Sequence, residues 1–342
     1  MEDLFIEFKS TYSILLSLFR TNQFFANALL VIYALLIWSP SFFISQAALS
    51  SDGTFIFDTL ATILPATGSI ANSLIAALLA LVQAIILNLM VSRYRLTEEI
   101  TLFPGLFYLL FMGFSGSFWT VNPLLIANFF LIFAIIELVE TYKEFSSADR
   151  IYNIGLFIGI ASLCYFSYIV FLVSAWIGIG ILRAIRWKER LILLFGFFSP
   201  YFLVFTYQFW NDHLSDFISQ EIGSNFHFFS YSPYRGYDDL ITLVLVMTML
   251  IIAVFSYKLY TYKKKIKIQK IIDLLYWGIA ATIISILFQA QINVQHFLML
   301  LPILAIFVSI NFVHMSRQWS EILHMLLLAG LLIWHYIPLL KI

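Results

Sequence analysis

The residues of this chain that are best suited to chemistry lie in three polar stretches set between long apolar segments. In the first stretch two carboxylates, Asp52 and Asp58, flank the sequence GTFIF. A carboxylate at either position could act as a general base on an acceptor hydroxyl or help hold a divalent metal ion. Both residues also fit a solvated loop, with an Asp-Gly turn at Asp52 and an N-cap at Asp58.

The second polar stretch, residues 211–239, is the longest segment that cannot be buried in lipid. It holds five acids, two histidines and a single cation, Arg235. A guanidinium presents a fork of donors that suits phosphate, whereas the competing interpretation is an ion pair with Asp238 or Asp239. His227 lies among aromatic residues and is a candidate substrate contact. It has no metal-ligand spacing from the other histidine, and it also fits a polar loop residue.

The third polar stretch is the sequence FQAQINVQHF, in which Gln291, Gln295 and His296 stand close before an apolar segment. Polar groups at membrane depth are costly unless they are partnered or face water. The stretch therefore fits either the lining of a cavity or a short hairpin in water.

The composition indicates which elements must position these residues. Of the 342 residues, 62% are apolar and 11% are charged, whereas ordinary soluble domains have about 45–50% and about 25%. The chain is therefore predicted to be a polytopic membrane protein. Its formal net charge is zero, which gives no electrostatic basis for binding nucleic acid. The single cysteine, Cys164, excludes an intrachain disulfide and argues against a thiolate metal cluster.

We predict an all-α protein in which residues 1–342 form a single transmembrane domain. Because a spanning helix needs roughly 20 mostly apolar residues, eleven crossings are expected. They run over about 24–43, 70–91, 102–114, 123–139, 151–182 (two crossings, with a break near 162–167), 191–209, 240–255, 272–287, 297–312 and 322–339. The segments 102–114 and 123–139 are short for a bilayer, so we expect them to be tilted, broken or sheltered by neighbouring helices.

The loops between these crossings alternate in basic content, and this alternation predicts the orientation, because short cytoplasmic loops retain Lys and Arg. One side carries 17 of the 19 basic residues: Lys9, Arg20, Arg93, Arg95, Lys143, Arg150, Arg183, Arg186, Lys188, Arg190, Lys258, Lys263, Lys264, Lys265, Lys267, Lys270 and Arg317. The other side keeps Arg235 and Lys341. The N-terminus is thus predicted to be cytoplasmic, with an interfacial amphipathic helix over 1–22, and the C-terminus periplasmic. The longest outer loops are expected at about 44–69 and 210–239.

Two sequences carry a resemblance to a known family. The run YNIGLFIGIASLCYFSYIVFLVSAWIGIGILRAIRWKERLILLFGFFSPYFLVF resembles the middle of integral-membrane glycosyltransferases of the GT-C type, which use polyprenyl-phosphate sugars. In that family a glycine-bearing broken hairpin precedes an Arg-rich inner turn. QHFLMLLPILAIF resembles their late helix, usually written with Arg-Tyr where this chain has Gln295 and His296. The whole chain also resembles a family of polytopic inner-membrane proteins of Gram-negative bacteria, from which no activity carries over.

The resemblance implies a protein of the bacterial inner membrane that acts at the periplasmic face on a polyprenyl-linked sugar, in assembly of an envelope glycan or glycoprotein. Asp52 or Asp58 would serve as base or metal ligand, and Arg235 would hold the phosphate. The residues expected to line the site are Gln291, Gln295, His296 and His227. One departure concerns the acids, which are commonly adjacent in those enzymes and stand apart here.

Two other functions fit the same sequence. The first is a non-catalytic membrane subunit or assembly factor of a cell-envelope complex, which would have a protein partner. The second is a transporter of lipid or a small solute. Most of the predicted crossings have no charged residue at their middle, which argues against ion coupling, although broken helices can supply backbone groups instead.

Overall fold

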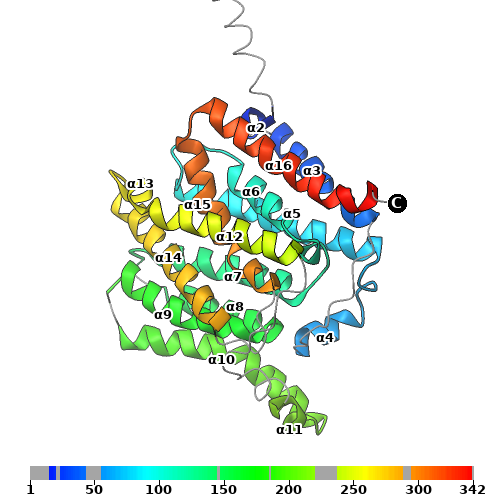
Figure 1. Ribbon diagram of the computed structural model, residues 1–342. Helices are drawn as coiled ribbons and strands as arrows, with labels where there is room; N and C mark the ends of the chain where they lie inside the picture. Colours follow the sequence, from blue (N-terminus) through cyan, green and yellow to red (C-terminus); the bar gives the residue numbers. More distant parts are fainter. Residues whose placement is uncertain are drawn as a thin grey trace, which may run out of the picture.

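The computed structural model describes residues 15–20, 24–43, 55–144, 147–184, 186–219, 237–287 and 294–340. These residues form helices and no strand (Figure 1). The first half comprises α2 (Leu15–Leu18), α3 (Phe24–Trp38), η1 (Ser39–Phe42), α4 (Phe55–Ala61), α5 (Ile70–Tyr94), α6 (Phe103–Met112), η2 (Gly116–Phe118), α7 (Pro123–Glu140) and α8 (Ala148–Cys164). The second half comprises η3 (Phe166–Ile169), α9 (Val170–Leu182), α10 (Trp187–Trp210), α11 (Leu214–Phe217), α12 (Tyr237–Phe255), α13 (Tyr257–Thr261), α14 (Ile266–Leu287), η5 (Val294–Met299), α15 (Leu301–His314) and α16 (Arg317–Leu340).

Each segment that the sequence predicted as a crossing overlaps a helix of the structure. Within the described ranges, five helical segments are long and apolar enough to span a membrane: Ile70–Tyr94, Pro123–Glu140, Trp187–Trp210, Ile266–Ile286 and Arg317–Ile337. Further apolar stretches are shorter, among them α6, Asp239–Phe255 of α12, and α15. The protein is therefore a helical membrane protein, while the number of crossings and the sides of the termini stay predictions.

Helix α6 shows how a short apolar segment is accommodated. All ten of its residues are buried, and it packs against α5, α15 and α3. A helix that is enclosed by protein on every side does not have to match the thickness of the bilayer. Of the three alternatives considered for 102–114, shelter by neighbouring helices is the one that the structure supports.

The long apolar run over 151–182 is interrupted where a break was predicted. Helix α8 ends at Cys164, Tyr165 is extended with φ −152° and ψ 112°, and η3 leads into α9.

Helices α8 and α10 come into close contact at two glycines, Gly155 of α8 and Gly196 of α10. A Cβ on Gly155 would lie 2.1 Å from the carbonyl oxygen of Leu193, so that no larger residue fits between these helices.

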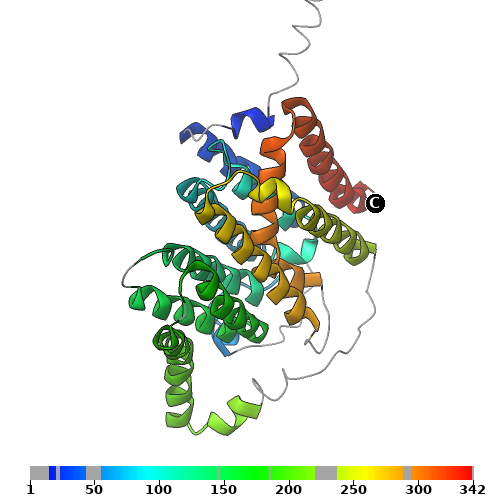
Figure 2. The same ribbon diagram turned by 90° about the vertical axis from the view of Figure 1, so that its left-hand side faces the viewer.

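The start of the described chain packs against its last helix. Helix α2 contacts α16, and the Leu16 N–H donates to the buried carboxylate of Glu321 at 2.9 and 3.0 Å. Figures 1 and 2 show α16 lying along the outside of the other helices. Of the interfacial helix predicted over 1–22, residues 1–14, 21 and 22 lie outside the described residues.

The helices run between two ends that differ in chemistry. We call one the basic end, because its helix termini and loops carry Arg93, Glu140, Arg150, Arg183 and Lys267. We call the opposite one the neutral end; it carries Trp119, Tyr165, His296 and His335, and its described acids Asp58, Asp212 and Asp216 are exposed. In Figure 1, α13 of the basic end lies at the left and the end of α16 lies at the right.

Candidate functional site at the neutral end

A tyrosine and a histidine meet at the break between α8 and α9. Tyr165 is the residue that separates α8 from η3, and its hydroxyl is hydrogen-bonded to Nε2 of His296 on η5. The two ring centres are 5.5 Å apart, and His296 is only 3% exposed. A tyrosine hydroxyl paired with an imidazole can donate hydrogen bonds to a ligand and can pass a proton.

Beneath this pair, Asn128 of α7 joins three elements through hydrogen bonds. Its Nδ2 donates to the carbonyl of Leu298 on η5 at 2.7 Å, and its Oδ1 accepts from the Tyr168 hydroxyl on η3 at 2.7 Å. Tyr168 also contacts the carbonyl of Leu124 at 3.2 Å. Asn128 and Tyr168 are fully buried. Because unpaired polar groups are costly in a buried site, this network fixes η3 and η5 relative to α7.

The network has a second layer on α5 and α6. Gln83 donates from Nε2 to the carbonyl of Leu125 at 2.7 Å, and its Oε1 accepts from the Tyr108 hydroxyl. Helix α7 itself starts at a strong cap, since the Asn122 side chain accepts from the Leu125 N–H at 2.8 Å. The floor of the candidate site is thus held by uncharged side chains that reach backbone carbonyls.

Further hydrogen bonds join helices to one another at the part of the neutral end next to α16. His335 donates from Nε2 to the carbonyl of Gly113 at 2.8 Å, and its ring lies 4.5 Å from that of Trp119. Trp38 donates from Nε1 to the Trp119 carbonyl at 3.2 Å. Thr242 donates to the carbonyl of Phe114 at 2.8 Å. These contacts tie α3, α12 and α16 to the segment around η2.

The structure describes three of the seven residues predicted for the site. His296 is buried against Tyr165, and Gln295 beside it is half-buried. The Nε2 of Gln295 is buried and has no hydrogen-bond partner within the described ranges. The other four, which are Asp52, His227, Arg235 and Gln291, lie outside the described residues.

Asp58 is the third described residue, and it lies on α4, a short helix that contacts α8. Its side chain is exposed, yet neighbouring protein partly desolvates the carboxyl and raises its pKa above the ordinary value. A carboxylate with a raised pKa binds a proton more tightly, and it is therefore a stronger general base. No hydrogen bond or ion pair joins Asp58 to His296 among the described residues, so the structure does not link these two predicted site residues directly.

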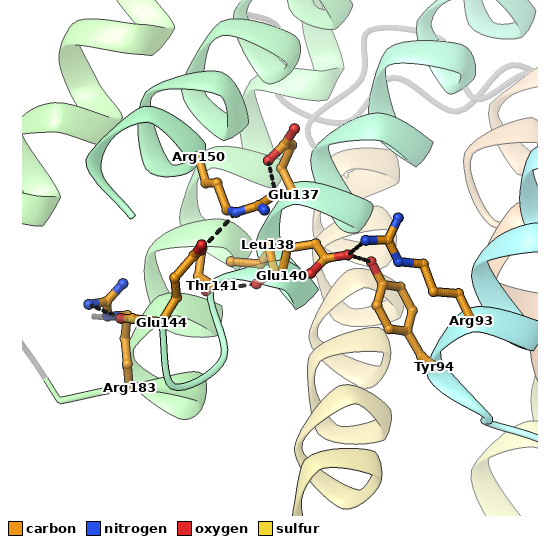
Figure 3. Close-up of polar contacts among 9 residues, drawn as sticks. All are labelled: Arg93, Tyr94, Glu137, Leu138, Glu140, Thr141, Glu144, Arg150 and Arg183. Carbon is orange, nitrogen blue, oxygen red and sulfur yellow. Dashed lines mark hydrogen bonds and ion pairs between the residues drawn. The ribbon is translucent and has the colours of Figure 1, made fainter. Parts of the chain in front are cut away.

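The acidic side chains at the basic end have a different role from those predicted for catalysis. Figure 3 shows Glu140 of α7 accepting from the Tyr94 hydroxyl at 2.8 Å and pairing with Arg93 at 2.7 Å. On the same helix Glu137 pairs with Arg150 at 3.2 Å. These two glutamates therefore join α7 to α5 and α8.

The described part of the neutral end contains no Lys or Arg, so a phosphate at this end would need a cation from elsewhere, which is the role predicted for Arg235. Within the described ranges, no group of three or more His, Cys, Asp and Glu side chains is placed to hold a metal ion. The described side chains can therefore supply hydrogen bonds and a proton relay, but not the charge that a phosphate requires.

Sequence reasoning found His296 and Gln295 but missed Tyr165, Asn128 and Tyr168. Tyr165 could have been noticed as a tyrosine inside the break predicted near 162–167. Asn128 is the one amide within an otherwise apolar stretch of α7, which is a signal that the prediction did not use.

Comparison with known proteins identifies the fold. No family model matches this chain, and no curated protein does. Among solved structures it is similar to ArnT from Cupriavidus metallidurans, crystallised bound to undecaprenyl phosphate, with a TM-score of 0.57 at 13% sequence identity. The match covers 89% of this chain and 63% of the ArnT chain, so this chain spans less than two thirds of ArnT. The protein therefore has an ArnT-like helical membrane fold.

Proposed function

We propose that this protein is a membrane glycosyltransferase of the GT-C type that takes a polyprenyl-phosphate sugar at its neutral end. The observation that carries the proposal is the similarity of its fold, over 89% of the chain, to a protein crystallised with undecaprenyl phosphate. Undecaprenyl phosphate is a polyprenyl phosphate, the lipid class that the sequence resemblance implies. The hydrogen-bonding pair at the helix break supports a site at this end.

The proposed reaction needs three roles from the chain. A carboxylate, Asp52 or Asp58, removes the proton from the acceptor hydroxyl while that oxygen forms a bond to the anomeric carbon of the sugar. The bond from this carbon to the lipid phosphate breaks, and the polyprenyl phosphate leaves with the electron pair. Arg235 stabilises the charge on the leaving phosphate. His296 and Tyr165 hold polar groups of the substrate at the break between α8 and α9, next to Gln295.

We place this chemistry at the periplasmic face of a bacterial inner membrane, with the chain acting as one transmembrane domain. The excess of Lys and Arg at the basic end supports this orientation, because the positive side of a membrane protein faces the cytoplasm. The neutral end then faces the periplasm. The product would be an envelope glycan or glycoprotein.

The proposal is tested with purified protein in lipid nanodiscs, supplied with a panel of radiolabelled polyprenyl-phosphate sugars and envelope acceptors. The expected result is release of polyprenyl phosphate coupled to labelling of one acceptor. The double variant D52N/D58N should bind donor normally and turn over about 10²–10⁴-fold more slowly, as expected when a general base is lost. R235A should weaken donor binding by about 10–100-fold, because a charge-assisted hydrogen bond is lost.

Asp212→Asn provides the matched control, because Asp212 is an exposed acid in the turn after α10 and has no assigned role. It should leave turnover and donor binding unchanged. Equal activity of wild-type protein and D52N/D58N would overturn the proposed roles of the acids. If no donor is consumed and a stoichiometric protein partner co-purifies, the function is that of a non-catalytic subunit. Flux of labelled lipid in proteoliposomes without sugar transfer would identify a transporter.

A further inference from the structure

The tyrosine and the histidine that meet at the helix break lie at short segments that depend on their neighbours. Tyr165 directly precedes η3, a 3₁₀ helix of four residues, and His296 lies on η5, a 3₁₀ helix of six residues. Hydrogen bonds in 3₁₀ helices have poorer geometry than those in α-helices, so such segments stay short and often mark hinges. The position of each ring therefore depends on contacts that η3 and η5 make with other helices.

Asn128 of α7 makes one such contact, and it reaches both segments at once. Its Nδ2 donates to the carbonyl of Leu298 at 2.7 Å, and its Oδ1 accepts from the Tyr168 hydroxyl at 2.7 Å. Leu298 follows His296 by two positions on η5. Tyr168 follows Tyr165 by three positions and lies on η3. A single buried amide thus connects the segment of the histidine to the segment that follows the tyrosine.

Ser285 of α14 makes a second connection between the same two segments. Its hydroxyl donates to the carbonyl of Ser167 on η3 at 3.1 Å, and its oxygen lies 3.8 Å from Sδ of Met299 on η5. Ser285 is buried, and a thioether sulfur is only a weak acceptor. Ser285 therefore holds η3 by a hydrogen bond and contacts η5 more weakly, whereas Asn128 forms a full hydrogen bond to each segment.

The two connections act in parallel, because one comes from α7 and the other from α14. When two restraints fix the same distance, the loss of one leaves the other in place, and the distance is released only when both are lost. Two such changes therefore have a combined effect larger than the sum of the single effects. Polar groups that are held in this way need no rearrangement when a substrate arrives.

We propose that Asn128 and Ser285 are positioning residues of the candidate site, which together hold the Tyr165 hydroxyl against Nε2 of His296 before any ligand binds. Neither residue touches the substrate, and each acts through the segments that it connects. The arrangement of the Tyr165–His296 pair can be measured in the protein alone, whereas its effect on turnover rests on the proposed sugar transfer. Failure of the positioning is therefore distinguishable from failure of the proposed function.

The first experiment measures the pair by nuclear magnetic resonance, with full-length protein in lipid nanodiscs and ¹⁵N in the histidine rings. The chain has six histidines, and the signals of His296 are those lost in H296Q. Y165F removes the hydroxyl and gives the Nε2 signal without its hydrogen bond. We expect N128L and S285A each to move this signal by a minor part of the Y165F displacement, with N128L the larger. The double variant N128L/S285A should move it by most of that displacement.

Thr282 provides the matched control for Ser285. It lies one turn earlier on α14 and is fully buried, yet its hydroxyl donates to the carbonyl of Gly278 on the same helix. T282A should leave the His296 signal in place, and N128L/T282A should match N128L alone. A displacement in N128L/S285A no larger than in N128L/T282A would overturn the role of Ser285. An undisplaced signal in N128L/S285A would overturn both roles.

The second experiment asks whether the arrangement matters for sugar transfer. In the turnover assay, N128L/S285A should lower kcat by about 10–100-fold, because a misplacement of about 1 Å can cost 10²-fold. The donor KM should rise by less, since Arg235, the proposed phosphate ligand, is unchanged. A displaced His296 signal with wild-type kcat would show that the pair takes no part in turnover and would overturn the positioning role. If the wild type consumes no donor, the proposed function fails, and the resonance experiment still decides the arrangement of the pair.

Thermal unfolding checks that every variant is folded. If N128L/S285A is not, Y168F/S285A takes its place, because Y168F removes the bond from Asn128 to η3 and keeps the bond to the Leu298 carbonyl. The connection through α7 is then cut at one end, and the same large displacement of the His296 signal is expected. A displacement no larger than that in Y168F alone would overturn the role of Ser285.

Discussion

The basic end and the neutral end hold the same helices together by different means. At the basic end, charged side chains bridge α5, α7, α8, α9 and α10, for example Arg150 to Glu137 and Arg183 to Glu189. At the neutral end, η3, η5 and α7 are joined by hydroxyl, amide and imidazole groups, such as Tyr168 and Asn128. The described helices of one bundle therefore combine ion pairs at one end with uncharged hydrogen bonds at the other.

Burial accounts for this difference. A charge is expensive to remove from water unless it is paired. Many charges of the basic end are accordingly exposed, and the buried Arg183 and Glu189 are paired with each other. An uncharged hydrogen bond costs less to bury, and Asn128, Tyr168 and His296 are each no more than 3% exposed. A neutral, rigid floor is also a suitable surround for a charged substrate, because it adds no competing counterion. The comparison predicts that variants at the two ends will differ in size of effect and in sensitivity to salt.

The largest effect on stability is expected from Glu189→Ala at the basic end. Glu189 and Arg183 are paired at 3.1 Å, and each side chain is only 10% exposed. Removing the acid leaves a largely buried guanidinium without a counterion, which costs about 3–5 kcal/mol. Unfolding of the purified protein in detergent, titrated with dodecyl sulfate, measures the loss.

The double variant Arg183→Met with Glu189→Ala tells whether the loss in Glu189→Ala comes from an unpaired buried charge or from lost packing. It is expected to recover part of the loss, since no charge is then left unpaired. If the double variant is as unstable as the sum of the single variants, the pair is not coupled and the basic end is not held by charge compensation.

A smaller effect is expected from Asn128→Leu at the neutral end. The change keeps the approximate volume and removes the bonds to the Tyr168 hydroxyl and to the Leu298 carbonyl. The loss should be about 1–2 kcal/mol, because hydrogen bonds between membrane helices are individually modest. Unlike the effect of an exposed ion pair, it should be the same at low and high ionic strength.

Tyr168→Phe is the companion of this variant, since it removes the hydroxyl alone. We expect this variant to lower the free energy of unfolding by about 1 kcal/mol. Combined with Asn128→Leu it should cost less than the sum of the two single losses, because the two residues share one hydrogen bond. A loss that diminishes in 1 M NaCl would contradict the assignment of neutral hydrogen bonding to this end.

The helices of the fold could be predicted from the sequence because each depends on local properties. An apolar run of sufficient length between polar loops marks a helix whichever neighbours it has. The break at Cys164 was also predictable, since the run over 151–182 exceeds the length of one crossing. The shelter of α6 could only be named as one alternative, because its burial depends on α3, α5 and α15.

The candidate site could be predicted only in part, because its contacts join distant parts of the chain. Tyr165 and His296 are 131 positions apart, and nothing in either local sequence specifies the other. His296 was found because several polar residues stand next to it in the sequence. Tyr165 lies in an apolar run, where one more aromatic residue attracts no attention. Neutral polar residues such as Asn128 give a weak signal, since the same residue type also occurs at caps and in loops.

The smallest effect is expected from Glu98→Gln, which removes an exposed ion pair at the basic end. Glu98 accepts from Lys264 at 2.8 Å, and its side chain is 60% exposed. The hydrogen bond and the charge of Lys264 lower the pKa of Glu98, so the ionised form stabilises the folded protein. That contribution is present above the ordinary Glu pKa of about 4.3 and is lost as pH falls through the lowered value. At pH 7 and low salt the variant should lose less than about 1 kcal/mol, and the difference should vanish in 1 M salt or in acid. Thermal unfolding of both proteins under these three conditions measures it, and a difference that persists in acid would assign the contact to packing and not to charge.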